Sequence, residues 1–429
     1  MPLRPLTSLV LLAVGLAATA PAVNADWPQW RGPHRDGKAV DANIRTDWEQ
    51  NPPTHLWTLE GVGYGYGSVA KIGDHLYTTG YTDKEEVVSA VDLNTRKVAW
   101  QTPIGPIVDM RNPTWEGSRS TPTMVGDRIY VVASVGKILC LETDSGKIVW
   151  QKTFADQFGS GEQSWGYAES PLVDGDVVVC TPGSDKALMV AFDRHSGKEL
   201  WRTPYTNLGE IGKKEAGYAS IVLSNAAGVK QYVQMTGKGL VGVRAADGEL
   251  LWHYNKVAND VAVIPTPIVT GDHVFASSGY QAGAALLRLT RDGKNEVKAE
   301  EVYFLDSKVF QNHHGQMILH EGHIYAGRGH GKGFPVCLEL KTGEVVWGDG
   351  ERGPGKGTAA VTFVDGHVIF RYQDGLVALI EATPEEYRLK GTFTPKFTEG
   401  RNWAHPVVQD GVLFLRQKDR IMAYDVAEE

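Results

Sequence analysis

The sequence predicts an all-β fold: an eight-bladed β-propeller of four-stranded antiparallel blades, closed by pairing of the N- and C-terminal strands. Two repeats point to it. An eleven-residue segment ending in tryptophan recurs five times along the 429 residues, and a strand, glycine turn and strand recur eight times. Two hairpins per period make four strands per unit, which is the size of a propeller blade. A chain of this length can bury a large core.

The tryptophan-ending segment has the pattern of a hairpin. Its copies are AVDLNTRKVAW, CLETDSGKIVW, AFDRHSGKELW, GVRAADGELLW and CLELKTGEVVW, ending at Trp100, Trp150, Trp201, Trp252 and Trp347. An alternating strand leads into a turn, in four copies with a glycine that tolerates positive φ, and a second strand follows. The acidic residues alternate with apolar ones, which favours solvated or turn-bonding roles over acid–base chemistry. The tryptophan is expected to bury a large area against the neighbouring unit.

The first position of the segment always holds a small residue. The five occupants are Ala90, Cys140, Ala191, Gly242 and Cys337. A thiol in this slot is therefore predicted to be a small buried side chain and not a nucleophile. The third cysteine, Cys180, lies elsewhere, and no CxxC or adjacent pair occurs. We expect all three to be thiols, with one disulfide as the alternative.

The second repeat sets the number of blades. Its turn glycines are spaced by 43 to 53 residues and are Gly73, Gly126, Gly175, Gly228, Gly271, Gly322, Gly366 and Gly411. The unit after Gly271 lacks the tryptophan ending, and Tyr303 is the expected substitute. After Gly411 the sequence stops one strand short, and the strand around Trp57 can supply it. That pairing would close the ring and remove the sheet edges. Seven blades is the alternative.

The first 25 residues have the pattern of a signal peptide. Arg4 precedes an apolar run from Leu9 to Ala20, and small residues precede Asp26. The run is too short to span a bilayer, so we expect cleavage and a periplasmic or secreted protein, with an uncleaved anchor as the alternative. Residues 26–54 are predicted to be a lead-in segment packed on the propeller, in part through Trp27 and Trp30, and residues 55–429 the propeller itself.

Charge limits the classes of partner. The formal net charge is −8 at pH 7, with no basic cluster. This argues against nucleic acid and against anionic membrane surfaces. We expect a monomer that does not insert into a membrane after signal cleavage.

The tryptophan-ending hairpins resemble the quinoprotein (PQQ) repeat family, over roughly residues 55–429. This family includes PQQ-dependent alcohol dehydrogenases and the outer-membrane assembly lipoprotein BamB. The opening DWPQWRGPHRDG, residues 26–37, also resembles the start of secreted PQQ-like propellers of unassigned role. The resemblance implies the fold. Family enzymes place PQQ near a disulfide of adjacent cysteines and beside Ca²⁺ held by Glu, Asn and Asp. This sequence has no adjacent cysteines and no matching cassette, and Asp26 stands where a lipoprotein would carry cysteine.

The repeat sorts candidate residues between the two faces of the ring. In a propeller, the tight hairpins share one face, while the blade connections and second-to-third strand loops share the other. Four histidines follow turn glycines, which indicates a structural role: His75, His273, His323 and His367. The connections hold the candidate ligand-binding residues, which are Trp115, Arg119, Trp165, Tyr167, Glu169, Tyr218, His313, His314, His330, Trp403 and His405.

Aromatic walls with a few polar groups suit a flat or polymeric ligand. Ordinary channel filling is the alternative, as is a buried ion pair between Glu169 and Arg119. The four histidines among the candidates lack the spacing of a known metal motif, so no metal site is predicted. No catalytic residue is identified.

The favoured function is an exported ligand-binding or protein-interaction module, whose partner is an unknown protein or polymeric ligand. One alternative is a quinoprotein oxidoreductase, acting on alcohols or polyvinyl alcohol, with PQQ and Ca²⁺ at the mouth. A second is a BamB-like outer-membrane assembly factor.

Overall fold

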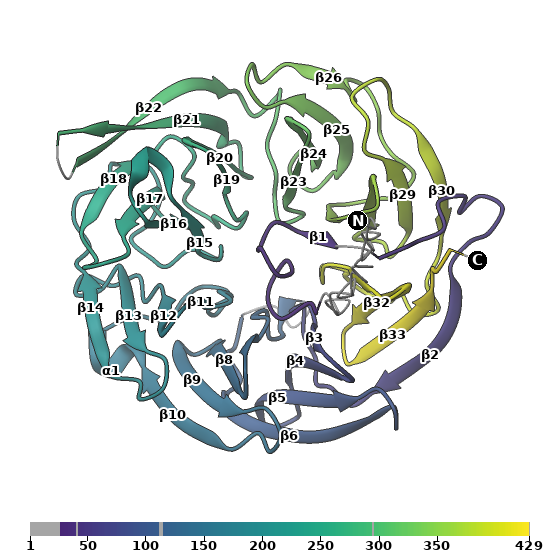
Figure 1. Ribbon diagram of the computed structural model, residues 1–429, viewed down its shortest axis with the longest axis horizontal. Coiled ribbons are helices and arrows are strands. Elements are labelled where there is room, and N and C mark those ends of the chain that lie inside the picture. Colours follow the sequence, from purple (N-terminus) through teal and green to yellow (C-terminus); the bar gives the residue numbers. More distant parts are fainter. Residues whose placement is uncertain (1–25, 40–41, 111–114, 294–295, 429) are drawn as a thin grey trace, which may run out of the picture.

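Eight separate β-sheets are arranged around a central axis in the computed structural model, which describes residues 26–39, 42–110, 115–293 and 296–428 (Figure 1). The predicted eight-bladed propeller is confirmed, and the alternative of seven blades is wrong. The predicted signal peptide, residues 1–25, lies outside the described residues.

Each blade is an antiparallel sheet whose first strand lines the channel and whose last strand lies at the rim. The strands of the first four blades are β3 (Ala70–Ile72), β4 (His75–Tyr81), β5 (Glu85–Asp92) and β6 (Lys97–Pro106); β7 (Thr123–Val125), β8 (Arg128–Ala133), β9 (Lys137–Glu142) and β10 (Ile148–Thr153); β11 (Leu172–Asp174), β12 (Val177–Cys180), β13 (Met189–Asp193) and β14 (Glu199–Thr203); and β15 (Val222–Ser224), β16 (Gln231–Thr236), β17 (Gly239–Arg244) and β18 (Leu250–Tyr254).

The other four blades complete the ring. Their strands are β19 (Ile268–Thr270), β20 (His273–Ser278), β21 (Gly283–Asp292) and β22 (Glu296–Leu305); β23 (Met317–His320), β24 (His323–Arg328), β25 (Phe334–Glu339) and β26 (Val345–Trp347); β27 (Ala359–Val364), β28 (His367–Tyr372), β29 (Val377–Glu381) and β30 (Leu389–Phe393); and β31 (Val407–Gln409), β32 (Val412–Gln417) and β33 (Arg420–Asp425) with β2 (Thr54–Glu60). Two short helices, α1 (Phe154–Phe158) and η2 (Ala226–Gly228), lie among the described residues.

The ring closes as predicted, by pairing of strands from the two ends of the sequence. β2 is antiparallel to β33, with Trp57 opposite Ala423. Blade 8 therefore takes three strands from the end of the chain and its rim strand from the beginning.

The repeated tryptophans of blades 1, 2, 3 and 6 hydrogen-bond to the next blade, whereas Trp252 of blade 4 donates its indole N–H to Gln231 of its own blade. Trp150 donates its indole N–H to the carbonyl oxygen of Arg194 in blade 3, at 2.9 Å, and Trp100 and Trp201 make the equivalent bond. The ring of Trp150 also covers Gly197, where an added Cβ would lie 2.6 Å from the indole. The turn glycine is thus required twice, by its φ of 67° and by the tryptophan of the preceding blade.

Blades 5 and 7 have no tryptophan at this position. Tyr303 takes the tryptophan position of blade 5, as predicted, and its hydroxyl donates to the carbonyl of Leu340 at 2.8 Å. In blade 7 the position is Gly391, opposite Leu379. Trp48 of the lead-in segment packs against Gly391 and is 1% exposed, so a residue from outside the repeat fills the space.

Residues 26–39, called the plug here, cross the centre of the ring (Figure 1). The backbones of Trp27 and Lys71 exchange two hydrogen bonds, and β1 (Lys38–Ala39) pairs in parallel with β27. Further in, Arg31 donates to the carbonyl of Met317 at 2.6 Å and Arg35 to that of Ser170 at 2.6 Å. The plug therefore fills the channel beside the turn glycines and reaches towards the opposite face.

The cysteines are buried, unpaired thiols, as predicted. Burial raises the pKa of Cys140 to about 11 and that of Cys337 to about 12. Both therefore remain protonated at neutral pH, which is consistent with a packing role. Across the described parts of the chain, no helix is long and apolar enough to cross a membrane.

Candidate functional site

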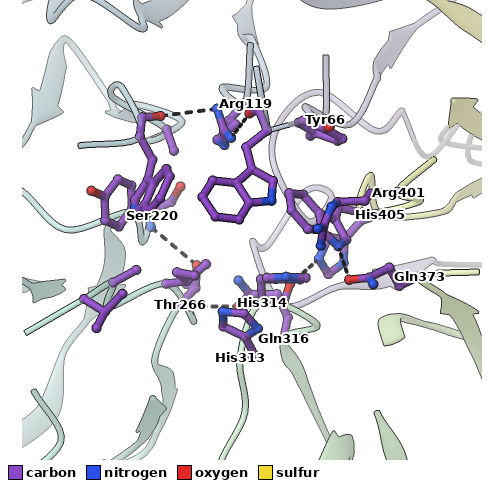
Figure 2. Close-up of a pocket in the computed structure, with 18 of the residues that line it drawn as sticks. Tyr66, Arg119, Ser220, Thr266, His313, His314, Gln316, Gln373, Arg401 and His405 are labelled. Carbon is purple, nitrogen blue, oxygen red and sulfur yellow. Dashed lines mark hydrogen bonds between the residues drawn. The ribbon is translucent and has the colours of Figure 1, made fainter. Parts of the chain in front are cut away.

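A cavity of about 550 Å³ opens at the face of the ring formed by the blade connections (Figure 2). We call it the mouth cavity. Among the described residues, its lining comes from Trp30 of the plug, from every connection between consecutive blades except that between blades 6 and 7, and from the second-to-third strand loops of blades 5, 6 and 7. No described residue of a tight hairpin contributes to it. The volume is within the range of pockets that bind small molecules.

Nine of the eleven candidate residues line this cavity. They are Trp115, Arg119, Trp165, Tyr218, His313, His314, His330, Trp403 and His405. They are distant in sequence, and the radial arrangement of the blades brings their connections to one place. Their role in binding is not tested by this placement and remains a prediction.

The other two candidates, Tyr167 and Glu169, lie in the packing between blades. Tyr167 is 2% exposed and donates its hydroxyl to the carbonyl of Pro182 at 3.0 Å. The carboxylate of Glu169 accepts bonds from the backbone and hydroxyl of Thr181, and burial raises its pKa to about 8. These side chains alternate with residues that face the channel, a distinction that sequence could not make for an irregular connection. The alternative Glu169–Arg119 ion pair is not among the contacts of the described residues.

Sequence reasoning missed several lining residues, among them Trp30, Tyr66, Tyr280 and Arg401. Trp30 belongs to the plug and forms part of the floor, where its ring meets that of His405 edge-on at 4.8 Å. Its indole N–H donates to Thr266 at 3.3 Å. Tyr66 and Arg401 lie in connections that also hold predicted residues or glycines, but no repeat marked them.

Five hydroxyl groups and the amide of Gln316, just before the innermost strands, form a hydrogen-bonded belt around the floor of the cavity. The backbone N–H of each residue donates to the side-chain oxygen of the next, over 2.8 to 3.4 Å, in the order Ser68, Thr121, Ser170, Ser220, Thr266 and Gln316. At the other end of the belt, Ser68 links it to the connection before blade 8 by donating its hydroxyl to the carbonyl of His405. In four blades this residue precedes the turn glycine by five positions, a signal that could have identified the belt.

Three histidines of the cavity lie ring to ring. The rings of His314 and His330 are each 4.2 Å from that of His313, and His313 Nε2 is 3.0 Å from the hydroxyl of Tyr280. Burial lowers the pKa of His313 to about 3, and burial with the field of Arg31 lowers that of His405 to about 3. The pKa of His314 is also lowered, mainly by burial. These imidazoles are neutral at physiological pH and offer hydrogen bonds rather than charge.

Arg119 stabilises the wall of the cavity. Its guanidinium donates to the carbonyls of Trp115, Gly117 and Trp165, which fixes two of the aromatic connections relative to each other. Nearby, Glu86 accepts bonds from the hydroxyls of Ser118 and Ser134, and burial raises its pKa to about 7.

No group of three or more His, Cys, Asp or Glu side chains is placed to hold a metal ion, as far as the described residues extend.

The sequence profile of the family described as "Outer membrane protein assembly factor BamB" matches residues 84–349, more than half of the chain. The chain belongs to this BamB-like family of PQQ-type propellers. The match spans blades 1 to 6 and therefore reflects the repeats that build the ring.

Relatives in the family have different roles. The chain is 24% identical over 178 residues to the outer membrane protein assembly factor BamB of Burkholderia pseudomallei, covering 41% of this chain and 43% of the relative. It is 24% identical over 233 residues to the quinoprotein alcohol dehydrogenase PedH of Pseudomonas putida, covering 49% and 38%. Each match thus spans less than half of the relative's length.

Among solved structures, the quinohemoprotein alcohol dehydrogenase of Comamonas testosteroni superposes with a TM-score of 0.64 at 12% identity. The superposition covers 94% of this chain and 81% of that one. At this identity the likeness establishes the fold alone.

Proposed function

We propose that the protein binds a small organic molecule with a flat ring system in the mouth cavity. The observation that carries this proposal is the concentration of seven Trp and Tyr side chains around one cavity of about 550 Å³. Five lie on blade connections, one in the plug and one in a second-to-third strand loop, all outside the repeated hairpins. Trp115 and Trp165 meet edge-on at 4.9 Å, and Tyr66 and Trp403 lie 4.8 Å apart. Such walls bury aromatic or cyclic ligands with little loss of side-chain entropy.

The cofactor pair of the family's enzymes fits this cavity only in part. A planar quinone suits the aromatic walls. Ca²⁺ requires six to eight oxygen ligands, carboxylates foremost, yet the described lining residues include two arginines and no Asp or Glu. The buried carboxyls of Glu86 and Glu169 are held within the blades by hydroxyl and backbone donors. The donor set does not fit a quinone–calcium pair, and we propose a binding protein instead of a dehydrogenase.

A BamB-like assembly role is supported by family membership alone. It predicts that an outer-membrane insertase co-purifies with the protein. We also propose export, which the pattern of residues 1–25 supports; N-terminal sequencing of the exported protein, expected to begin at Asp26, tests this.

Quenching of tryptophan fluorescence by the ring probe 2-naphthamide tests ligand binding. We expect saturation at one site per chain, and loss of the site in Trp403→Ala, whose ring contacts Tyr66 and His314 in the cavity. His273→Ala, at a tight hairpin on the opposite face, is the control and should bind normally. Saturation that is unchanged in Trp403→Ala, or absent in the natural protein, would contradict the proposal.

A further inference from the structure

The charges of the mouth cavity have one sign. Arg119 and Arg401 are its ionised side chains, and no Asp or Glu occurs among its described lining residues. Two arginines also lie buried close to its floor, Arg31 at 5% exposure and Arg371 at 0%. Both contribute to the field that disfavours a proton on His405.

These buried arginines are bound by neutral acceptors. Arg31 donates to the carbonyls of Arg35, Asp36 and Met317. Arg371 donates to the carbonyls of Ala404 and Arg416 and to the side-chain oxygens of Asn402 and Gln417. The carbonyl and amide oxygens bind most of the guanidinium N–H groups, while Arg31 Nη1 and Arg371 Nε have no hydrogen-bond partner among the described residues. Neutral acceptors leave the positive charge in place, and the field of Asp36 offsets that of Arg31 in part, so the potential at the cavity floor is positive.

The two lining arginines differ in their contacts. Arg119 is committed to carbonyl oxygens of the wall. The guanidinium of Arg401 lies over two rings, 5.0 Å from the centroid of Trp403 and 5.9 Å from that of Trp115, and its recorded contacts within the described residues include no hydrogen-bond acceptor or carboxylate. An arginine stacked in this way keeps its in-plane N–H groups available to a carboxylate.

The far side of the cavity is apolar. Val261, Ala262 and Ile264 belong to the connection that leads to Thr266, and Figure 2 shows Thr266 and Ser220 across the cavity from Arg401 and Gln373. Val261 lines the cavity and is 40% exposed, although valine is among the residue types most often buried. The site is therefore cationic at one end and hydrophobic at the other.

We propose, building on the ligand-binding function above, that the ligand is an amphipathic organic anion: an aromatic carboxylate whose acid group binds Arg401 and whose ring system extends between the tryptophans towards Val261 and Ile264. Because the described lining residues include no Asp or Glu, no carboxylate among them competes with the acid group of the ligand for Arg401. A neutral amide of the same shape gains the aromatic contacts and a hydrogen bond to a neutral acceptor, but not the charge-assisted pairing with the guanidinium.

The test compares two probes of equal shape, 2-naphthoate and the neutral 2-naphthamide, by fluorescence titration. We expect the natural protein to bind 2-naphthoate at least about tenfold more tightly. Arg401→Gln should remove this preference while leaving 2-naphthamide affinity within about twofold. Arg401→Lys should restore part of the preference, because it keeps the charge but not the paired N–H groups.

A matched control is Arg128→Gln, an arginine that begins β8 on the hairpin face and pairs with Asp127. It should bind both probes as the natural protein does. Equal affinities for the two probes in the natural protein, or an undiminished preference in Arg401→Gln, would overturn the inference while the ring-binding function stands. Absence of a mouth site for either probe would instead remove the proposed function itself.

Discussion

The two faces of the propeller are built from the same blades but use their residues differently. On the hairpin face, equivalent positions recur from blade to blade, and four histidines that follow turn glycines occupy the same place in β4, β20, β24 and β28. On the mouth face, each connection has its own length and sequence, and aromatic, arginine and imidazole side chains converge on one cavity. In this ring, repetition marks residues that build the blades, and departure from it marks residues available for binding.

Replacing a repeat glycine gives the largest effect. Gly197→Ala places a methyl group 2.6 Å from the Trp150 ring at a φ of 67°. Backbone strain and overpacking together should lower the free energy of unfolding by about 4 kcal/mol. Chemical denaturation measures this loss. Gly175→Ala is the matched control, since its φ is 59° but no atom lies within 4 Å of the added Cβ; it should lose only about 1 kcal/mol. Equal losses of unfolding free energy in the two variants would mean that the contact with Trp150 is not the reason why glycine is required at position 197.

Glu86→Gln tests the cost of ionising a carboxyl that is buried beneath the mouth face. The folded protein holds the Glu86 proton up to a pKa of about 7, whereas the unfolded chain releases it near 4.5. The protonated Glu86 carboxyl therefore contributes its full stabilisation below pH 4.5, and this contribution is lost as the pH rises from 4.5 through 7. The stability of Glu86→Gln relative to the natural protein should increase by roughly 3 kcal/mol between pH 4.5 and pH 8.

Urea unfolding at a series of pH values measures this difference. Glu162→Gln, an exposed position in the connection before β11, should show no such trend. A relative stability of Glu86→Gln that is independent of pH would mean that the carboxyl ionises as freely in the blade as in water.

The smallest effect on stability is expected in the mouth itself. Trp165→Ala removes a half-buried ring that meets Trp115 edge-on, and the backbone carbonyl that accepts a bond from Arg119 remains. The free energy of unfolding, followed by thermal denaturation, should change by less than about 1 kcal/mol, while the affinity for 2-naphthoate falls. Trp150→Ala, a repeat tryptophan, should cost about 3–5 kcal/mol. A comparable loss in both variants would assign Trp165 to packing and erase the contrast between the faces.

The fold could be predicted because its main determinant is periodic. The spacing of turn glycines gave eight blades, and the missing rim strand after Gly411 pointed to Trp57. Even Tyr303 could be placed, since a large side chain with a donor was needed at one register position. The exception in blade 7, where Trp48 covers Gly391, was not visible because the compensating residue lies some 340 positions away in the sequence.

The candidate site could be predicted only as a region. The recurring position five residues before the turn glycine marks Ser170, but no periodic signal shows that Ala168 lines the cavity while Glu169 points into the blades. Trp30 was assigned to packing of the lead-in segment, yet it also forms the floor of the cavity. Whether Arg401 is available to a ligand depends on which acceptors surround it in space, and no local pattern encodes that.

The plug bears on why the ring has eight blades. Blades of this kind are wedges, and wedges alone could close at a neighbouring number with slight changes in tilt. Within fourteen residues, however, the plug contacts the inner strands, or the residues just before them, in blades 1, 2, 3, 5, 6 and 7. The length of the plug therefore fixes how far apart these inner strands can lie. Gain or loss of a whole repeat would change the diameter of the channel and leave the plug too short or too long to reach these blades, so a short segment outside the repeats constrains the number of repeats in this chain.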